Sequence, residues 1–154
     1  MHLLSTGDAA ASRTQDCNCL ALRQAARHIT QHYDQYLSPT GLRSTQFSIL
    51  ARLNRLGPLT INELAAELVM DRTTLGRNVL PLQRDGLIAI HTSPQDRRRK
   101  ELRLTDAGNS RLAGAVDAWA AAQESFEAAF GKTKAGDLRS LLGGVVGTNL
   151  QSAS

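Results

Sequence analysis

The four consecutive cationic residues Arg97 to Lys100 are the most direct indication of a binding site in this sequence. Neighbouring positive charges repel one another, so clustering them is costly unless a polyanion lies near. Pro94 and the polar residues around it predict a hairpin loop, and a basic loop tip can reach the narrow minor groove of DNA, where the potential is most negative. Asp96 makes sense in such a loop if its carboxylate holds the guanidinium of Arg98. A solvated surface loop is the alternative.

A second group of polar side chains stands at the start of a predicted helix, directly after a short turn. In a helix-turn-helix, the second helix lies in the major groove and presents polar residues from its N-terminal turns. Arginine suits guanine, asparagine suits adenine, and threonine suits thymine methyls or phosphates. An ordinary solvated helix face is the alternative. With the loop included, the candidate DNA-binding residues are Arg72, Thr73, Thr74, Arg77, Asn78, Asp96, Arg97, Arg98 and Arg99.

The elements that must position these residues follow from capping signals and apolar periodicity. Thr60 and Glu63 form a capping box and Asp71 is a good N-cap, so two short helices are expected in succession. Leu75, Val79 and Leu82 form the predicted buried stripe of the second helix. The sequence predicts a mainly α fold with a small β-hairpin, a winged helix-turn-helix. Helices are expected over 16–37, 44–56, 60–68, 71–85, 105–130 and 134–148, and strands over 87–91 and 101–104.

The composition narrows the class of protein. The 154 residues are 42% hydrophobic, enough for a compact core, and the net charge of +4 suits a polyanionic partner without proving one. No apolar run approaches the roughly 20 residues of a membrane span and no signal-peptide pattern opens the chain, so a cytoplasmic protein without membrane contact is expected. The chain has no glycine-rich nucleotide loop, no HExxH and no nucleophile–base–acid set. The sequence therefore predicts neither an enzyme nor a cofactor.

The stretch LTINELAAELVMDRTTLGRNVLPLQRDGLI, followed by SPQDRRRKELRLTDAG, resembles the MarR (multiple antibiotic resistance regulator) family. The most specific part is Asp96-Arg97-Arg98 followed by L-x-L-T-x-x-G over 102–108, and the similarity in helical order covers about 17–148. This resemblance implies an obligate homodimer that binds pseudo-palindromic promoter DNA, usually as a repressor. It also implies that Arg98 enters the minor groove and that Asp96 orients it.

The resemblance and the apolar stripes of the terminal helices together predict the domain organisation. Residues 1–15 are expected to form a flexible arm, 16–40 and 106–150 to form dimerisation helices, and 41–105 to form the winged helix-turn-helix. Alternatively, the apolar stripes of the terminal helices pack into the hydrophobic core of a single chain. A non-specific architectural DNA-binding protein and a winged helix that binds protein are the alternative functions. Salt dependence and discrimination between sites separate these three readings.

Effectors of the MarR family bind between the dimerisation helices and the DNA-binding lobe, so the resemblance implies such a site here. The residues expected near it are cationic and partly aromatic, which would suit a small aromatic or carboxylate effector. The candidates are Arg23, Arg27, His28, Tyr33, Arg43 and Phe47.

Cys17 and Cys19 are the other candidates for sensing. Cysteines two residues apart are poorly placed to form a structural disulfide, and a helix N-terminus favours the thiolate form of a cysteine. Cys19 to Leu22, with Tyr33 fourteen residues after Cys19, is similar to the first helix of the organic-hydroperoxide sensors of the same family, which implies a reactive Cys19 held by tyrosine. Ser44 stands where a second tyrosine is expected, and no C-terminal cysteine is present. Redox sensing, a soft-metal site and inert thiols all remain open.

Overall fold

The computed structural model describes residues 10–11 and 13–152, and it has the expected mainly helical fold with a two-stranded antiparallel wing. Every helix and strand boundary predicted above is confirmed to within two residues. Residues 1–9 and 12 of the expected N-terminal arm lie outside the described residues, and residues 10, 11 and 13 are helical. The elements are α2 (Asn18–Leu37), η1 (Ser38–Thr40), α3 (Ser44–Leu56), α4 (Ile61–Leu68), α5 (Arg72–Arg84), β1 (Ile88–Thr92), β2 (Lys100–Leu104), α6 (Asp106–Phe130) and α7 (Lys132–Val146).

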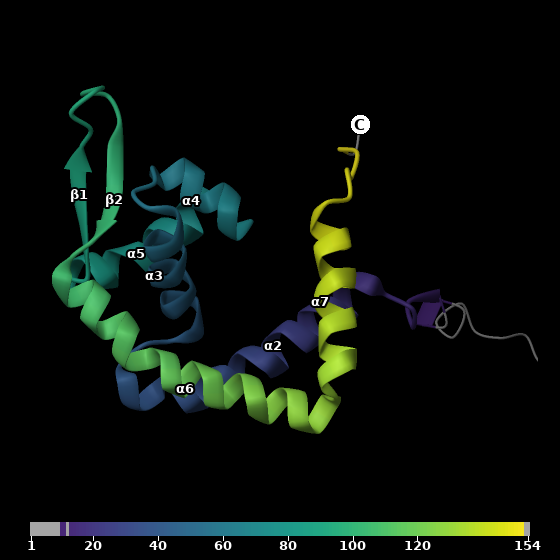
Figure 1. Cartoon of the computed structure of the whole chain (residues 1–154). Coiled ribbons are helices and arrows are strands. Elements are labelled where there is room, and N and C mark those ends of the chain that lie inside the picture. The colour runs from purple at the N-terminus through teal and green to yellow at the C-terminus, as the bar shows by residue number, and fades with distance from the viewer. Residues whose placement is uncertain (1–9, 12, 153–154) are drawn as a thin grey trace, which may run out of the picture.

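Figure 1 shows a lobe and a set of long helices that meet along α6. The lobe contains α3, α4, α5 and the wing, whereas α2 packs against α6 and α7 turns away at the far end of α6. A single 3-10 turn, η1, and Gly41 with a φ of 76° lead the chain from α2 into α3. The candidate DNA-binding residues therefore all belong to the lobe.

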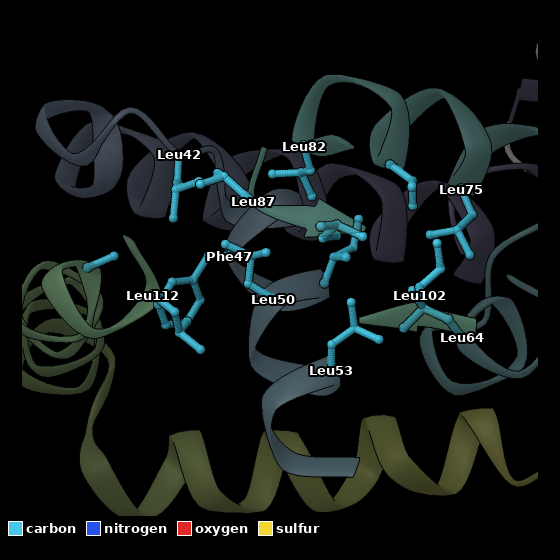
Figure 2. Packing of buried hydrophobic residues seen from close by; sticks show 14 of the residues in the cluster. Leu42, Phe47, Leu50, Leu53, Leu64, Leu75, Leu82, Leu87, Leu102 and Leu112 are labelled. Atoms are coloured by element: carbon cyan, nitrogen blue, oxygen red, sulfur yellow. The ribbon is translucent and has the colours of Figure 1, made fainter. Parts of the chain in front are cut away.

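One hydrophobic core holds the lobe together (Figure 2). Ile49 and Leu50 of α3 are completely buried in it, and so are Leu64 of α4 and Leu75 of α5. Burying side chains of this size stabilises the fold by roughly 1.5–3 kcal/mol each, so α4 and α5 are held against α3 as one rigid unit. The buried stripe predicted for α5 is confirmed at Leu75, Val79 and Leu82.

The turn between α4 and α5 is made at Val69, which has left-handed backbone angles of φ 53° and ψ 46°. Among the described residues, Val69 is the one non-glycine residue with a positive φ. A β-branched side chain is poorly accommodated there, because its Cβ substituents crowd the backbone. The Val69 N–H donates to the carbonyls of Ala65 and Ala66, so the conformation is imposed by the end of α4. The angle between the two helices thus depends on a strained residue.

Val69→Asn is expected to stabilise the protein by roughly 1 kcal/mol, because asparagine tolerates the left-handed region. The Val69 side chain is 69% exposed, so its removal sacrifices little packing. Thermal denaturation measures the effect. Val69→Thr keeps the branched Cβ and is the matched control, for which no gain in stability is expected. A lower Tm for Val69→Asn than for wild type would contradict the assigned strain.

The wing is tied to the lobe at its base. Ile88 pairs with Leu104 in the antiparallel hairpin. Leu102 of β2 exchanges two backbone hydrogen bonds, of 2.7 and 3.3 Å, with Leu59 just before α4. Because the Leu102 side chain is also buried in the core, the hairpin starts from a fixed point beside the helix-turn-helix.

Apolar side chains remain exposed along the terminal helices. Leu20, which shares an apolar helix face with Leu37, is 49% exposed, and Leu37 is the one residue of α2 that is buried. On α6, Leu112 is buried, whereas Val116 and Phe130 are exposed. On α7 the exposed apolar residues are Leu141, Leu142, Val145 and Val146. Within the described residues, the hydrophobic core of a single chain therefore leaves part of these apolar stripes uncovered. None of the described helices is both long and apolar enough to cross a membrane.

Candidate nucleic-acid interface

The helix expected to read DNA, α5, begins at a well-formed N-cap. The Asp71 carboxylate accepts hydrogen bonds from the Thr74 hydroxyl at 2.6 Å and from the Thr74 backbone N–H at 2.8 Å. These bonds hold the pKa of Asp71 below its ordinary value of 3.8, so the carboxylate is charged at the helix N-terminus. Asn78 donates from its side-chain amide to the Thr74 carbonyl at 2.8 Å. Thr74 and Asn78, two of the predicted base-reading residues, are therefore engaged by the helix itself.

Arg72, Thr73 and Arg77 are the predicted residues of α5 that stay available. All three are exposed, and their side chains have no hydrogen-bond or ion-pair partner within the described part of the chain. Leu75 and Val79 point into the core. Thr73 and Arg77 lie on the opposite side of the helix, whereas Arg72 is exposed at its first residue. They occupy the N-terminal turns from which a recognition helix contacts base edges and phosphates.

The wing loop is closed by its own backbone and by Asp96. Ser93 donates its N–H to the Arg99 carbonyl at 2.8 Å, and Arg99 donates its N–H to the Asp96 carbonyl at 3.0 Å. The Asp96 carboxylate accepts the backbone N–H of Arg98 at 2.9 Å. The predicted carboxylate–guanidinium contact is therefore wrong, because the short side chain of Asp96 bonds the backbone two residues on. Arg97 and Arg98 are exposed at the tip.

Arg99 differs from its neighbours in the loop, because its guanidinium is already bound. Its Nη1 and Nη2 donate to the two carboxylate oxygens of Glu63 at 2.8 and 2.7 Å, and its Nε donates to Glu101 at 2.9 Å. These bonds lower the pKa of Glu63 and of Glu101, and the two carboxylates raise the pKa of Arg99. The sequence predicts a DNA contact for Arg99, whereas the structure places it between two carboxylates.

A cavity of about 350 Å³ lies between the lobe and the long helices. Phe47 of α3 and Trp119 of α6 stack on its wall, with ring centroids 6.0 Å apart. Arg52 and Arg55 of α3 supply positive charge to the lining. Arg52 also forms an ion pair with Glu67 of α4 at 3.6 Å, so the cavity wall contacts the helix-turn-helix.

Two of the predicted effector residues, Tyr33 and Phe47, line this cavity. The Tyr33 hydroxyl donates to Oε1 of Gln123, and burial, followed by the nearby carboxylate of Glu127, raises the pKa of Tyr33. Tyr33 is therefore a neutral hydrogen-bonding group. The predicted residues that do not line the cavity are Arg23, Arg27, His28 and Arg43; Arg27 borders a second pocket on α2.

Arg52, Arg55 and Trp119 are among the lining residues that were not predicted from the sequence. A signal for Arg55 was present, since it lies eight residues after Phe47 and positions eight apart share a helix face. Trp119 packs against the hydrophobic core and also lines the cavity.

Both cysteines are exposed free thiols at the start of α2. The Sγ of Cys17 accepts the Leu20 backbone N–H at 3.4 Å and so caps the helix. Cys19 and Tyr33 lie fourteen residues apart on one helix, which is about 21 Å at 1.5 Å per residue. The expected contact between Cys19 and this tyrosine is therefore wrong within one chain. The described residues contain no group of three or more potential metal ligands.

A helix-turn-helix with an exposed N-terminal turn, joined to a hairpin with a basic tip, defines a winged helix-turn-helix DNA-binding protein. A family model, "MarR family", matches residues 42–100. The M. tuberculosis transcriptional regulator MOSR, in its crystal structure in complex with DNA, is 36% identical to this chain. That match covers 88% of this chain and 100% of MOSR, with a TM-score of 0.73. The chain belongs to the MarR family of transcriptional regulators, which confirms the resemblance carried by the wing sequence.

Two further relatives agree with this assignment. The transcriptional repressor CouR from Rhodococcus jostii RHA1, solved on a 23-mer DNA duplex, is 26% identical with a TM-score of 0.76, and the match covers 94% of this chain and 99% of CouR. The HTH-type transcriptional regulator YwoH of Bacillus subtilis is 32% identical over 84 residues. That match covers 54% of this chain and 61% of YwoH. The family match also confirms that the chain is a regulator and not an enzyme, as the sequence predicts.

Proposed function

We propose that this chain is a homodimeric repressor that binds a pseudo-palindromic promoter duplex. The proposal rests on the exposed start of α5 and the exposed basic wing tip, which belong to elements that are anchored to one core. In the proposed complex, Arg72, Thr73 and Arg77 approach the major groove and Arg98 enters the flanking minor groove. The relatives solved with DNA, MOSR and CouR, support duplex DNA as the partner, and the description of CouR as a repressor supports the direction of control.

A second copy of the chain is proposed to cover the apolar stripes of the terminal helices. Leu141 and Val146 of α7 are 70% and 65% exposed, and Leu20 of α2 is 49% exposed. Single exposed apolar residues are ordinary, but several on one set of helices mark an interface. The dimer would place its two recognition helices about one DNA turn, roughly 34 Å, apart. Light scattering should then give twice the 16.6 kDa mass of one chain.

Fluorescence anisotropy with the duplex from upstream of its own gene tests the proposal. A shuffled duplex of the same composition is the control, and both titrations are run over a salt series with excess competitor DNA. Binding that resists competitor and weakens steeply with salt is expected of a specific regulator. Equal affinity for the native and shuffled duplexes would favour the architectural alternative.

We further propose that the cavity lined by Phe47 and Trp119 binds a small aromatic carboxylate, and that binding releases the DNA. A volume of about 350 Å³ suits such a ligand, the stacked rings suit an aromatic ring, and Arg52 and Arg55 suit a carboxylate. A ligand carboxylate would compete with Glu67 for Arg52 and so loosen the link between α3 and α4. The two recognition helices would then no longer match both half-sites.

Trp119 is the one tryptophan of the chain, so its fluorescence reports on the cavity directly. Saturable binding of 4-hydroxybenzoate is expected, with about tenfold weaker binding of 4-hydroxybenzyl alcohol, because the alcohol lacks the charged hydrogen-bond acceptor. Arg55→Gln should weaken 4-hydroxybenzoate binding by about the same factor. Arg23→Gln removes an arginine outside the cavity and is the control without effect. Equal affinity for the acid and the alcohol would rule out a carboxylate ligand.

Release of the DNA by cysteine oxidation is a separate prediction. The DNA titration is repeated with reduced and with oxidised protein, using Cys19→Ser as the control. Oxidation that weakens DNA binding in the wild type but not in the variant would support a sensing role for Cys19. Oxidation without effect would leave ligand binding as the one proposed means of release.

A further inference from the structure

Arg99 joins two elements that are far apart in the sequence. Glu63 lies in the first turn of α4, and Glu101 lies on β2 of the wing. The planar guanidinium is bonded by Glu63 in the bidentate geometry that fixes both distance and orientation, and its Nε is bonded by Glu101. Arg103 donates to the second oxygen of Glu101 at 3.2 Å. The four side chains form one continuous network between the wing and the helix-turn-helix.

The Glu63 carboxylate is itself held in place by the end of its helix. Its Oε2 accepts the Thr60 backbone N–H at 2.9 Å, and the Thr60 hydroxyl accepts the Glu63 backbone N–H at 3.2 Å. This reciprocal capping box fixes the carboxylate independently of Arg99. The capping signal read from the sequence therefore has a second use, because the same glutamate anchors the wing.

In this arrangement the Arg99 guanidinium has few hydrogen-bond donors left for a DNA phosphate. Three of its five N–H donors are already bonded to carboxylates. Arg99 and Arg103 carry two positive charges, and Glu63 and Glu101 carry two negative charges, so the network is neutral overall. Arg97 and Arg98, by contrast, have no side-chain partner in the described part of the chain.

We infer that Arg99 is a positioning residue that sets the place of the wing relative to α4 and α5, and that it is not a DNA contact. The inference rests on the proposed DNA-binding function. The Arg99–Glu63 contact keeps the wing tip at a fixed distance from the recognition helix, so that Arg98 reaches its groove when α5 occupies the neighbouring one.

The two possible roles of Arg99 predict opposite effects of Glu63→Gln. Glutamine keeps the capping hydrogen bonds of α4 but loses the charge that holds Arg99. If Arg99 positions the wing, Glu63→Gln weakens DNA binding. If Arg99 binds phosphate, Glu63→Gln tightens DNA binding, because it frees the guanidinium and removes a negative charge near the DNA.

The experiment measures the affinity of the full-length dimer for the duplex from upstream of its own gene and for a mixed-sequence duplex, over a salt series. We expect Glu63→Gln, Arg99→Gln and Arg99→Lys each to weaken specific binding by about fivefold, the upper range for an exposed ion pair. Lysine should not rescue, because it keeps the charge but lacks the planar fork. The double variant Glu63→Gln/Arg99→Gln should be no weaker than either single variant.

The salt dependence separates positioning from direct contact. Each lost phosphate contact lowers the slope of log affinity against log salt by about 0.9, so Arg99→Gln should leave the slope at its wild-type value. Arg97→Gln, an exposed neighbour in the same loop, is the matched control that should lower it. Tighter binding by Glu63→Gln, rescue by Arg99→Lys or a reduced slope for Arg99→Gln would each overturn the positioning role. Wild-type protein that binds neither duplex would overturn the proposed function, and this inference with it.

Discussion

Arg98→Ala is expected to weaken binding to the specific duplex on the order of 100-fold while the dimer stays folded. A side chain that reads a groove contributes roughly 1–3 kcal/mol, and the proposed dimer loses one such contact from each wing. Arg98 is exposed at the loop tip, and within the described residues its guanidinium bonds no protein group. The folded state therefore loses little when the side chain is removed.

The measurement is a competition anisotropy titration, with circular dichroism and light scattering to verify the fold and the dimer. Lys132→Ala removes an equal charge from α7, away from the wing, and controls for the change in net charge. Affinity within a few-fold of wild type is expected for Lys132→Ala. An Arg98→Ala dimer that binds the duplex as tightly as wild type would remove Arg98 from the interface.

Asp96 extends the same test to the backbone of the loop. Asp96→Asn keeps an oxygen that can accept the Arg98 backbone N–H, so it should bind DNA at least as well as wild type. Asp96→Ala removes that acceptor and loosens the turn, so it should lose part of the affinity that Arg98→Ala loses. Equal losses in both Asp96 variants would point to the charge of the carboxylate instead of its hydrogen bond.

Most of the fold was predictable from the sequence because its signals are local. Thr60 with Glu63 and Asp71 both cap helices through hydrogen bonds to residues three positions away, and the structure forms these bonds as expected. Leu75 and Val79 repeat at the helical period, so they also identified the buried face of α5. Signals of this kind act within a few residues, and no tertiary contact is needed to read them.

The parts of the site that the sequence did not reveal depend on contacts between distant residues. Arg99 belongs to a basic run by sequence, but Glu63, thirty-six residues earlier, neutralises it. The cavity forms where α2, α3 and α6 meet, so periodicity alone could not separate Arg55, which lines it, from Arg23, which does not. Leu20 has an apolar helical spacing, yet no partner within the described chain covers it. Periodicity predicts which face is apolar but not what covers it.

Gly108 shows why the L-x-L-T-x-x-G motif ends in glycine. The residue lies in the first turns of α6, directly against the backbone where the chain enters β1. A Cβ added to Gly108 would lie 2.1 Å from the carbonyl oxygen of Leu87 and 3.0 Å from its carbonyl carbon. The same carbonyl accepts the backbone N–H of Thr105 at 3.2 Å, so it cannot move without losing that bond. Glycine therefore permits the close approach of α6 to the wing.

Gly108→Ala is accordingly expected to destabilise the protein by about 2 kcal/mol, because overpacking against backbone outweighs the roughly 1 kcal/mol that alanine gains in a helix. The corresponding fall in Tm is about 5 °C for a chain of this size. DNA affinity should fall as well, because the shift needed to relieve the contact moves the wing relative to α6 and hence relative to the second half of the proposed dimer.

Gly114→Ala is the matched control, since it lies on the same helix and a Cβ there meets no atom within 4 Å. Helix propensity then acts alone, and Gly114→Ala should raise the stability by roughly 1 kcal/mol. The two substitutions add the same methyl group to the same helix, so their opposite effects on Tm isolate the contact with Leu87. A Tm for Gly108→Ala at or above that of wild type would mean that the wing and α6 tolerate separation, and that the glycine of the motif does not fix their distance.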